Sequence, residues 1–355
     1  MEDNELPPDA APVEPPLVLP ARPGPNIWMA LLWWLGLLVA QLVIGVVAGV
    51  AIVIVALIAR GRQGLDARAI LESRSVMLAL IIAATGGTLL VAAAVVTAVY
   101  RGRARRVIAL RGLDPRHVIL IVLMVPPLLI VGSEVQSLAA RVLPHWGVND
   151  AAYGQISQQN WIVILVVACL FPGVGEELFF RAFLGRGLVA QHGVVWGTVS
   201  TALLFGALHF EPAQVLGTAV LGIAFHVAYL NTKSFLAPVL FHALNNAAAF
   251  GLMQLAADPR WRVVLGEDES APPLVVAGAL AALLAMGWLL YAMRTRWLLS
   301  DRRVWSPGYV TAEMPPAHLE AVARLATPCL LVVALAVLGY LAFAGALAWE
   351  LRALW

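Results

Sequence analysis

Long apolar runs, separated by short polar or arginine-rich segments, dominate the hydropathy pattern of this 355-residue chain. A helix needs roughly 20 apolar residues to cross the hydrocarbon core of a bilayer. The pattern therefore predicts an all-α fold, a polytopic transmembrane helical bundle with about 8–9 spans. The predicted spans are approximately residues 28–58, 76–100, 117–138, 158–190, 193–210, 213–231, 234–254, 273–293 and 324–349.

Two of these spans carry helix-disrupting residues. The fourth span is too long for one straight crossing, and Pro172-Gly173 predicts a kink within it. The third span contains Pro126-Pro127, so we expect it to be bent or broken; a re-entrant third span would invert everything after it. Gln191-His192-Gly193 predicts a tight turn between the fourth and fifth spans.

Composition excludes a soluble protein, because 61% of the residues are hydrophobic and only 12% are charged, against about 25% charged in soluble domains. Residues 1–27 are Pro-rich and acidic, which predicts a disordered tail. Cys169 and Cys329 both lie in apolar runs and are interpreted as buried small residues. Usage rich in Ala, Arg and Gly indicates a GC-rich bacterial genome, so the expected location is the bacterial inner membrane.

Arginine clusters set the expected orientation. One lies within residues 101–116 and another within 294–303. The positive-inside rule places such loops in the cytoplasm, and nine spans put both on one side. We interpret the clusters as topology anchors and expect no nucleic-acid partner.

Two adjacent carboxylates, Glu176 and Glu177, stand within an apolar stretch. A charge at the bilayer centre costs about 2.5–3.5 kcal/mol on insertion scales, so an intramembrane carboxylate is a functional-site hypothesis. Arg181 lies one helical turn after Glu177 and predicts an ion pair. Glu176 points about 100° away and has no local partner, which favours a catalytic role.

Later spans carry further polar residues at suitable depth. Glu176 lies about 14 residues before the predicted turn and His209 about 16 after it, so each is roughly 21–24 Å from the turn. An antiparallel hairpin would bring them together. His242 and Asn246 share one helix face.

Two other residues receive plainer interpretations. His226 stands alone in its span and is predicted to be a hydrogen-bonded core histidine, with a supporting role as the alternative. Phe205, one turn before His209, is predicted to be a packing residue rather than a substrate contact.

A carboxylate, two imidazoles and an amide suffice for peptide hydrolysis. A buried carboxylate can take a proton from water, and an imidazole with an amide can stabilise an oxyanion. The set Glu176, His209 and His242 is also a candidate for holding one divalent metal such as zinc. The cofactor therefore stays open between none and one metal ion.

Three motifs carry a family resemblance: Glu176-Glu177-x-x-x-Arg181, Phe205-x-x-x-His209 and His242-x-x-x-Asn246. Together they resemble the type II CAAX prenyl endopeptidase and bacteriocin-processing family (CPBP, or Abi). The resemblance covers about residues 156–254.

The resemblance implies an intramembrane endopeptidase, either a glutamate protease or a metalloprotease. It implies that Glu176 and His209 activate water and that His242 and Asn246 stabilise the oxyanion. Glu177, Arg181 and Phe205 would support the site. The expected substrate is a membrane-embedded peptide or lipidated protein, of the prenylated or bacteriocin type linked to this family.

Two other classes of function remain open at this point. One is a non-catalytic membrane scaffold or immunity protein that keeps the motifs; the other is a small-solute transporter, although no internal repeat is visible. The predicted organisation is a tail, three N-terminal transmembrane helices, a catalytic CPBP-like core and a C-terminal transmembrane extension. These units correspond to residues 1–27, 28–145, 156–254 and 273–355.

Overall fold

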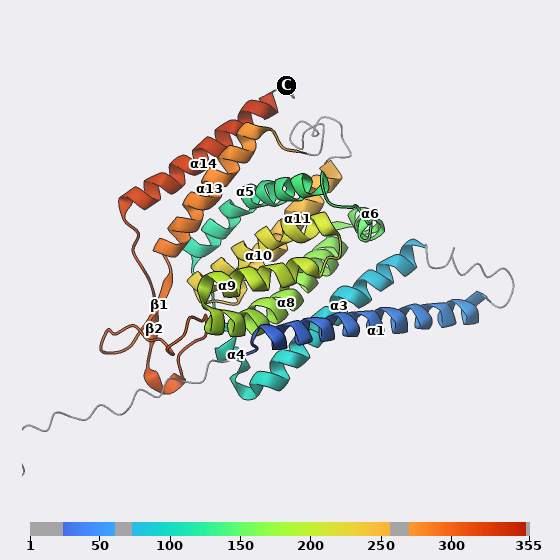
Figure 1. Cartoon of the computed structure of the whole chain (residues 1–355), viewed down its shortest axis with the longest axis horizontal. Coiled ribbons are helices and arrows are strands. Elements are labelled where there is room, and N and C mark those ends of the chain that lie inside the picture. Colours follow the sequence, from blue (N-terminus) through green and yellow to red (C-terminus); the bar gives the residue numbers. More distant parts are fainter. Residues whose placement is uncertain (1–23, 61–72, 256–269, 353–355) are drawn as a thin grey trace, which may run out of the picture.

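The computed structural model describes residues 24–60, 73–255 and 270–352 (Figure 1). The predicted disordered tail lies outside the described residues, apart from 24–27. The described part contains eight helices long and apolar enough to cross a membrane. The predicted all-α, polytopic helical bundle is therefore confirmed.

The α-helices are α1 (Ile27–Arg60), α3 (Arg74–Tyr100), α4 (Ala104–Val107), α5 (Pro115–Ala140), α6 (Asp150–Ser157), α7 (Trp161–Val163), α8 (Phe171–Glu177), α9 (Arg186–Ala207), α10 (Pro212–Thr232), α11 (Leu236–Leu255), α13 (Pro273–Ala292) and α14 (Leu330–Leu351). Two π-helices flank α8, namely η2 (Ile164–Leu170) and η3 (Leu178–Gly185). Short 3₁₀ turns are η1 (Arg101–Arg103) and η5 (Ala317–Leu319). Strands β1 (Thr295–Leu298) and β2 (Val322–Leu325) pair antiparallel.

The predicted turn before the fifth span is present. Gly193 has φ 80° and ψ 172°, which is not helical, so the 161–207 segment comprises two helices rather than one. Gly197 lies against the backbone of Val189, and the rings of Phe180 and Phe205 are 5.4 Å apart. These contacts require the chain to fold back at Gly193, because a continuous helix would separate both pairs widely.

The third span differs from its prediction. α5 runs continuously from Pro115 to Ala140 with Pro126 and Pro127 inside it, so the expected break is wrong, and its length is that of a complete span. Each proline removes one backbone hydrogen bond, but neighbouring helices can compensate within a membrane bundle. Here α5 packs on α10, α11 and α13.

The small β1–β2 hairpin was not predicted from the sequence. Its strands have four residues each and lie within an arginine-containing connection, so no hydrophobic alternation marks them. Backbone hydrogen bonds hold this region to the other loops, from Met314 N to Arg106 O and from Phe235 N to Ala109 O. We call residues 101–114, 232–235 and 294–328 the basic end; Figure 1 shows β1, β2 and α4 there and α6 at the opposite end.

Both cysteines were predicted to be buried. Cys169 on η2 is buried, as expected, but Cys329 is exposed, and that prediction is wrong. Cys329 is the N-cap residue of α14 and directly follows the basic end.

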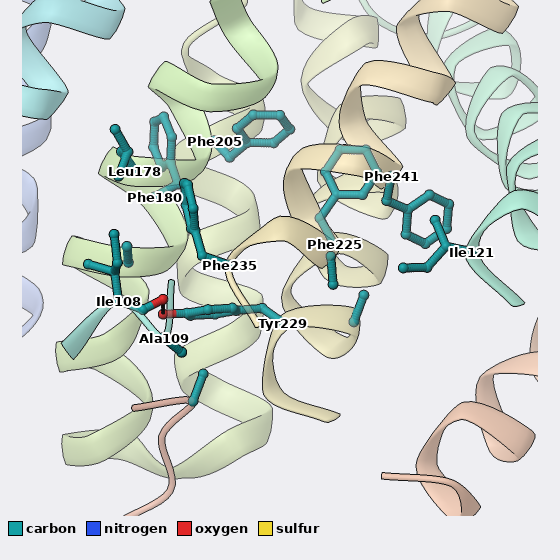
Figure 2. Packing of buried hydrophobic residues seen from close by; sticks show 14 of the residues in the cluster. Ile108, Ala109, Ile121, Leu178, Phe180, Phe205, Phe225, Tyr229, Phe235 and Phe241 are labelled. Atoms are coloured by element: carbon teal, nitrogen blue, oxygen red, sulfur yellow. Dashed lines mark hydrogen bonds between the residues drawn. The ribbon is translucent and has the colours of Figure 1, made fainter. Parts of the chain in front are cut away.

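Buried aromatic rings fill the space between the central helices (Figure 2). Phe225 of α10 lies 5.3 Å from the ring of Phe241 on α11, and Phe180 of η3 contacts Phe205 of α9. Tyr229 donates from its hydroxyl to Ile108 O, which ties α10 to the basic end. Burying a large side chain contributes roughly 1.5–3 kcal/mol in water; inside lipid the same rings act through close packing.

Candidate active site

Glu176 and Glu177 end α8, between the two π-helices η2 and η3. A π-helix widens the turn and rotates the side chains that follow it, and such segments are frequent at functional sites. The Glu176 side chain is 15% exposed, whereas the Glu177 side chain is fully buried. The two adjacent carboxylates therefore face different surroundings.

Glu177 forms the predicted ion pair with Arg181. Arg181 NH1 donates to Glu177 Oε1 at 2.8 Å, and both side chains are fully buried. Arg181 NH2 donates to Gly222 O, and the guanidinium lies 4.2 Å from the centre of the Phe205 ring. A buried charge needs this kind of compensation.

His242 joins this pair, which sequence reasoning missed. Its Nδ1 lies 2.8 Å from Glu177 Oε1, and its Nε2 lies 4.0 Å from Glu176 Oε2. An ionised carboxylate can only accept hydrogen bonds, so we assign the proton to Nδ1. Nε2 is then turned towards Glu176. Glu177 thus orients the imidazole as well as neutralising Arg181.

Phe205 links the two histidines. Its ring centre is 5.7 Å from that of His209 and 5.7 Å from that of His242. Phe205 is almost fully buried, and Phe225 stacks on the other side of His242 at 5.0 Å. Phe205 therefore packs between functional groups, in agreement with its predicted role as a packing residue.

His209 follows the last turn of α9, at the opposite end from the basic loops. Its backbone carbonyl accepts a hydrogen bond from Asn149 Nδ2, and its Nδ1 is buried with no hydrogen-bond partner in the described part of the chain. The Phe205 ring contacts both imidazoles, so the hairpin brings His209 close to His242; its common depth with Glu176 stays a prediction.

Asn246 lies one turn after His242 on α11. Its Nδ2 donates to Ala168 O of η2 at 2.9 Å, so this donor ties α11 to η2. The second N–H of Nδ2 is available for the role in oxyanion stabilisation that the resemblance implies. That role stays a prediction.

Residues 146–157, which include α6, cover the end of the bundle where His209 lies. The hydropathy pattern did not predict this cover. Asn149 donates to His209 O and to Gln214 Oε1, and Gln214 donates to the hydroxyl of Tyr153 on α6. Glu211 is buried and accepts hydrogen bonds from the backbone N–H groups of Trp146 and Gly147. The signal available was the polar run Gly147–Gln159 directly before an apolar span.

The hydrogen bonds that Glu211 accepts from this segment should depend on pH. Burial raises the pKa of Glu211, but the backbone N–H groups of Trp146 and Val148, then the charge of His145 and the N–H of Gly147, outweigh it, so the pKa lies below its ordinary value. The stabilisation is therefore present above the pKa of the unfolded state and is lost as pH falls through the folded pKa. We expect Glu211→Gln to speed hydrogen exchange at the Trp146 and Gly147 amides at neutral pH.

The control for that measurement is Glu320→Gln, which removes an exposed carboxylate of the basic end, far from Glu211. Equal exchange in wild type and Glu211→Gln at neutral pH would contradict the assignment. A difference that disappears in acid would support it.

His226 departs from its prediction. It is fully buried on α10, but neither ring nitrogen has a hydrogen-bond partner within the described residues, so a hydrogen-bonded core histidine is wrong. Gly185 of η3 packs directly against its ring. The close helix approach leaves no room for a side-chain partner on that face.

The proposed metal ligands do not form a metal site here. In residues 24–60, 73–255 and 270–352, no three His, Cys, Asp or Glu side chains are grouped so that they could hold a metal ion. Among the candidates Glu176, His209 and His242, the last has its Nδ1 engaged by Glu177. A carboxylate on Nδ1 is common behind metal-binding histidines and leaves Nε2 free, so the cofactor stays open between none and one metal ion.

Gly175 allows Glu176 to approach α3 closely. A Cβ atom at Gly175 would lie 2.7 Å from Leu89 Cα, whereas one at Gly173 would meet nothing closer than Val239 O at 3.4 Å. We expect Gly175→Ala to destabilise the protein by about 1–3 kcal/mol, through overpacking, and to lower activity by moving Glu176. Gly173→Ala in the same helix is the matched control, with thermal unfolding and turnover as readouts; equal effects would contradict this reasoning.

Comparison with known proteins supports the predicted resemblance. Residues 158–248 match the family model described as type II CAAX prenyl endopeptidase Rce1-like. This segment contains all three motifs, from Glu176 to Asn246. The chain thus carries an Rce1-like segment, which supports an intramembrane protease of the CAAX type. Searches of curated proteins and of solved structures found no significant match.

Proposed function

We propose that this chain is an intramembrane endopeptidase that hydrolyses a peptide bond of a membrane-associated substrate with water activated by Glu176. The observation that carries the proposal is the meeting of three distant motifs around one buried cluster. Glu176, with its partly exposed carboxylate, lies 4.0 Å from His242, whose other nitrogen is held by Glu177. Packing alone gives no reason to place these groups together in lipid.

In this mechanism Glu176 takes a proton from a water molecule, and the resulting hydroxide attacks the scissile carbonyl carbon. His209, on the adjoining helix, shares the water. The carbonyl oxygen gains negative charge, which His242 stabilises as an Nε2–H donor. In the doubly protonated ring that this step uses, Nδ1–H donates to Glu177 while Nε2–H faces the oxyanion. Glu176 then passes its proton to the leaving amine, and the carbon–nitrogen bond breaks.

The proposed substrate class is a membrane-embedded peptide or a lipidated protein of the prenylated or bacteriocin type. Apolar helices surround the cluster, and many large apolar side chains elsewhere on the bundle are exposed, as a lipid-facing surface requires. A substrate held in the bilayer can reach such a site laterally. The proposed location is the inner membrane of a bacterium.

The test compares membrane peptides from cells with the wild-type protein and with Glu176→Gln by mass spectrometry. We expect an uncleaved precursor to accumulate in the variant and its cleavage products to disappear. Glu134→Gln is the matched control, because Glu134 is another carboxylate of a spanning helix and accepts from Ala271 N. If Glu176→Gln fully reverses the phenotype caused by loss of the gene, and the membrane peptides do not change, the chain is a scaffold instead.

A further inference from the structure

A cavity lies at the basic end, and its lining does not include Glu176. It has a volume of about 620 Å³ and lies between α9, α10, the end of α13 and the connection that follows β1. Val194, Val227 and Leu230 form an apolar wall, and Lys233, Arg294 and Arg296 bring three positive charges. None of the proposed catalytic residues lines it.

The three cations of this cavity have no carboxylate beside them in its lining. Within the described residues, none of Lys233, Arg294 and Arg296 has a carboxylate within ion-pair distance; the nearby Glu313 is paired with Arg186 and Arg106. Three cations around one hollow repel each other unless an anion joins them.

Lys233 is placed there at a conformational cost. It ends α10 with φ 49° and ψ 41°, the left-handed conformation that glycine usually supplies after a helix. Its Nζ donates to Thr311 O at 2.7 Å, and burial, followed by the charge of Arg111, lowers its pKa to about 8. The bond to Thr311 O holds the amine at the cavity.

The wall of the cavity continues into the surface that faces lipid. Val194 borders the hollow and is 43% exposed, and Trp196 beside it is 69% exposed. Trp305 and Tyr309 also line the cavity, and such aromatic residues are enriched at the level of lipid headgroups. The apolar residues of this lining suit acyl chains, the aromatic residues suit the headgroup level, and the cations suit a phosphate.

We propose that this cavity binds the headgroup of an anionic phospholipid from the leaflet at the basic end. The phosphate lies between Lys233, Arg294 and Arg296, and the acyl chains follow the wall of Val194 and Val227. Basic pockets between transmembrane helices bind anionic headgroups in this way. The site is independent of peptide hydrolysis, so it stands whether or not the chain is a protease.

The sequence offers a direct test, because Lys233 is its only lysine. The full-length protein is reconstituted into vesicles of phosphatidylcholine alone or with phosphatidylglycerol, and a soluble amine-acylating reagent is added. The rate of acylation of the peptide containing Lys233 is measured by mass spectrometry. We expect phosphatidylglycerol to lower the acylation rate at least about tenfold, because an amine bound to an anion for most of the time is protected from the reagent.

Two variants separate binding from a general surface effect. Arg105→Lys introduces an exposed amine at the same end, and we expect phosphatidylglycerol to slow it much less than Lys233. Arg294→Gln with Arg296→Gln keeps Lys233 and should lose its protection. Equal slowing of the introduced amine and of Lys233 would overturn the proposal.

The source of the phosphate is separated in a third arm. Glycerol phosphate is added to the phosphatidylcholine vesicles at the concentration of phosphatidylglycerol. If this soluble ligand protects Lys233 as well as the lipid does, the cavity is a site for a soluble phosphate and the lipid assignment is wrong. Protection by the lipid alone supports the proposal.

Discussion

Purified protein with Glu176→Gln is expected to hydrolyse its substrate about 10²–10⁴-fold more slowly than the wild type, because the amide cannot take a proton from water. The substitution keeps the size of the side chain and removes a charge with no ion-pair partner closer than His242 at 4.0 Å. We therefore expect the midpoint temperature of thermal unfolding in detergent to be unchanged or slightly higher. Turnover is measured on the precursor that accumulates in cells with this variant.

Glu134→Gln provides the comparison for that experiment, since it makes the same chemical change on α5. Its turnover should stay within about twofold of the wild type, as for surface changes away from the chemistry. Wild-type turnover by Glu176→Gln would remove Glu176 from the mechanism and leave the proposed function without its base. Loss of turnover in both variants would point to a folding defect.

Residue spacing alone predicted the part of the site that depends on helix geometry. The Glu177–Arg181 pair follows from a four-residue separation on one helix. The turn at Gly193 is present as predicted, and with a fixed rise per residue it predicts a common depth for Glu176 and His209. Both inferences needed only distances along the chain.

The missed parts depend on how helices rotate against each other. The contact between Glu177 and His242 joins α8 to α11, and no spacing within either helix specifies which faces meet. The same holds for His226, whose burial could be inferred but whose lack of partners depends on the close approach of Gly185. The π-helices around α8 also change the rotation of side chains relative to a regular helix.

Arg181→Ala should destabilise the protein by about 3–5 kcal/mol, because it leaves the buried Glu177 carboxylate without its cation. Replacing both partners, with Glu177→Gln and Arg181→Met, removes both buried charges and should restore most of the stability. Denaturant or thermal unfolding in detergent measures the difference. If the double variant is no more stable than Arg181→Ala, the two residues do not stabilise each other.

Activity should separate from stability in the same double variant. Glu177 also orients His242 through Nδ1, and an amide in its place can bind the ring but carries no negative charge. Amide-for-carboxylate changes next to a working histidine lower turnover by up to about 10⁴-fold, so we expect a loss of at least about 10²-fold despite restored folding. Recovery of turnover together with stability would show that Glu177 only neutralises Arg181, and that His242 needs no carboxylate behind it.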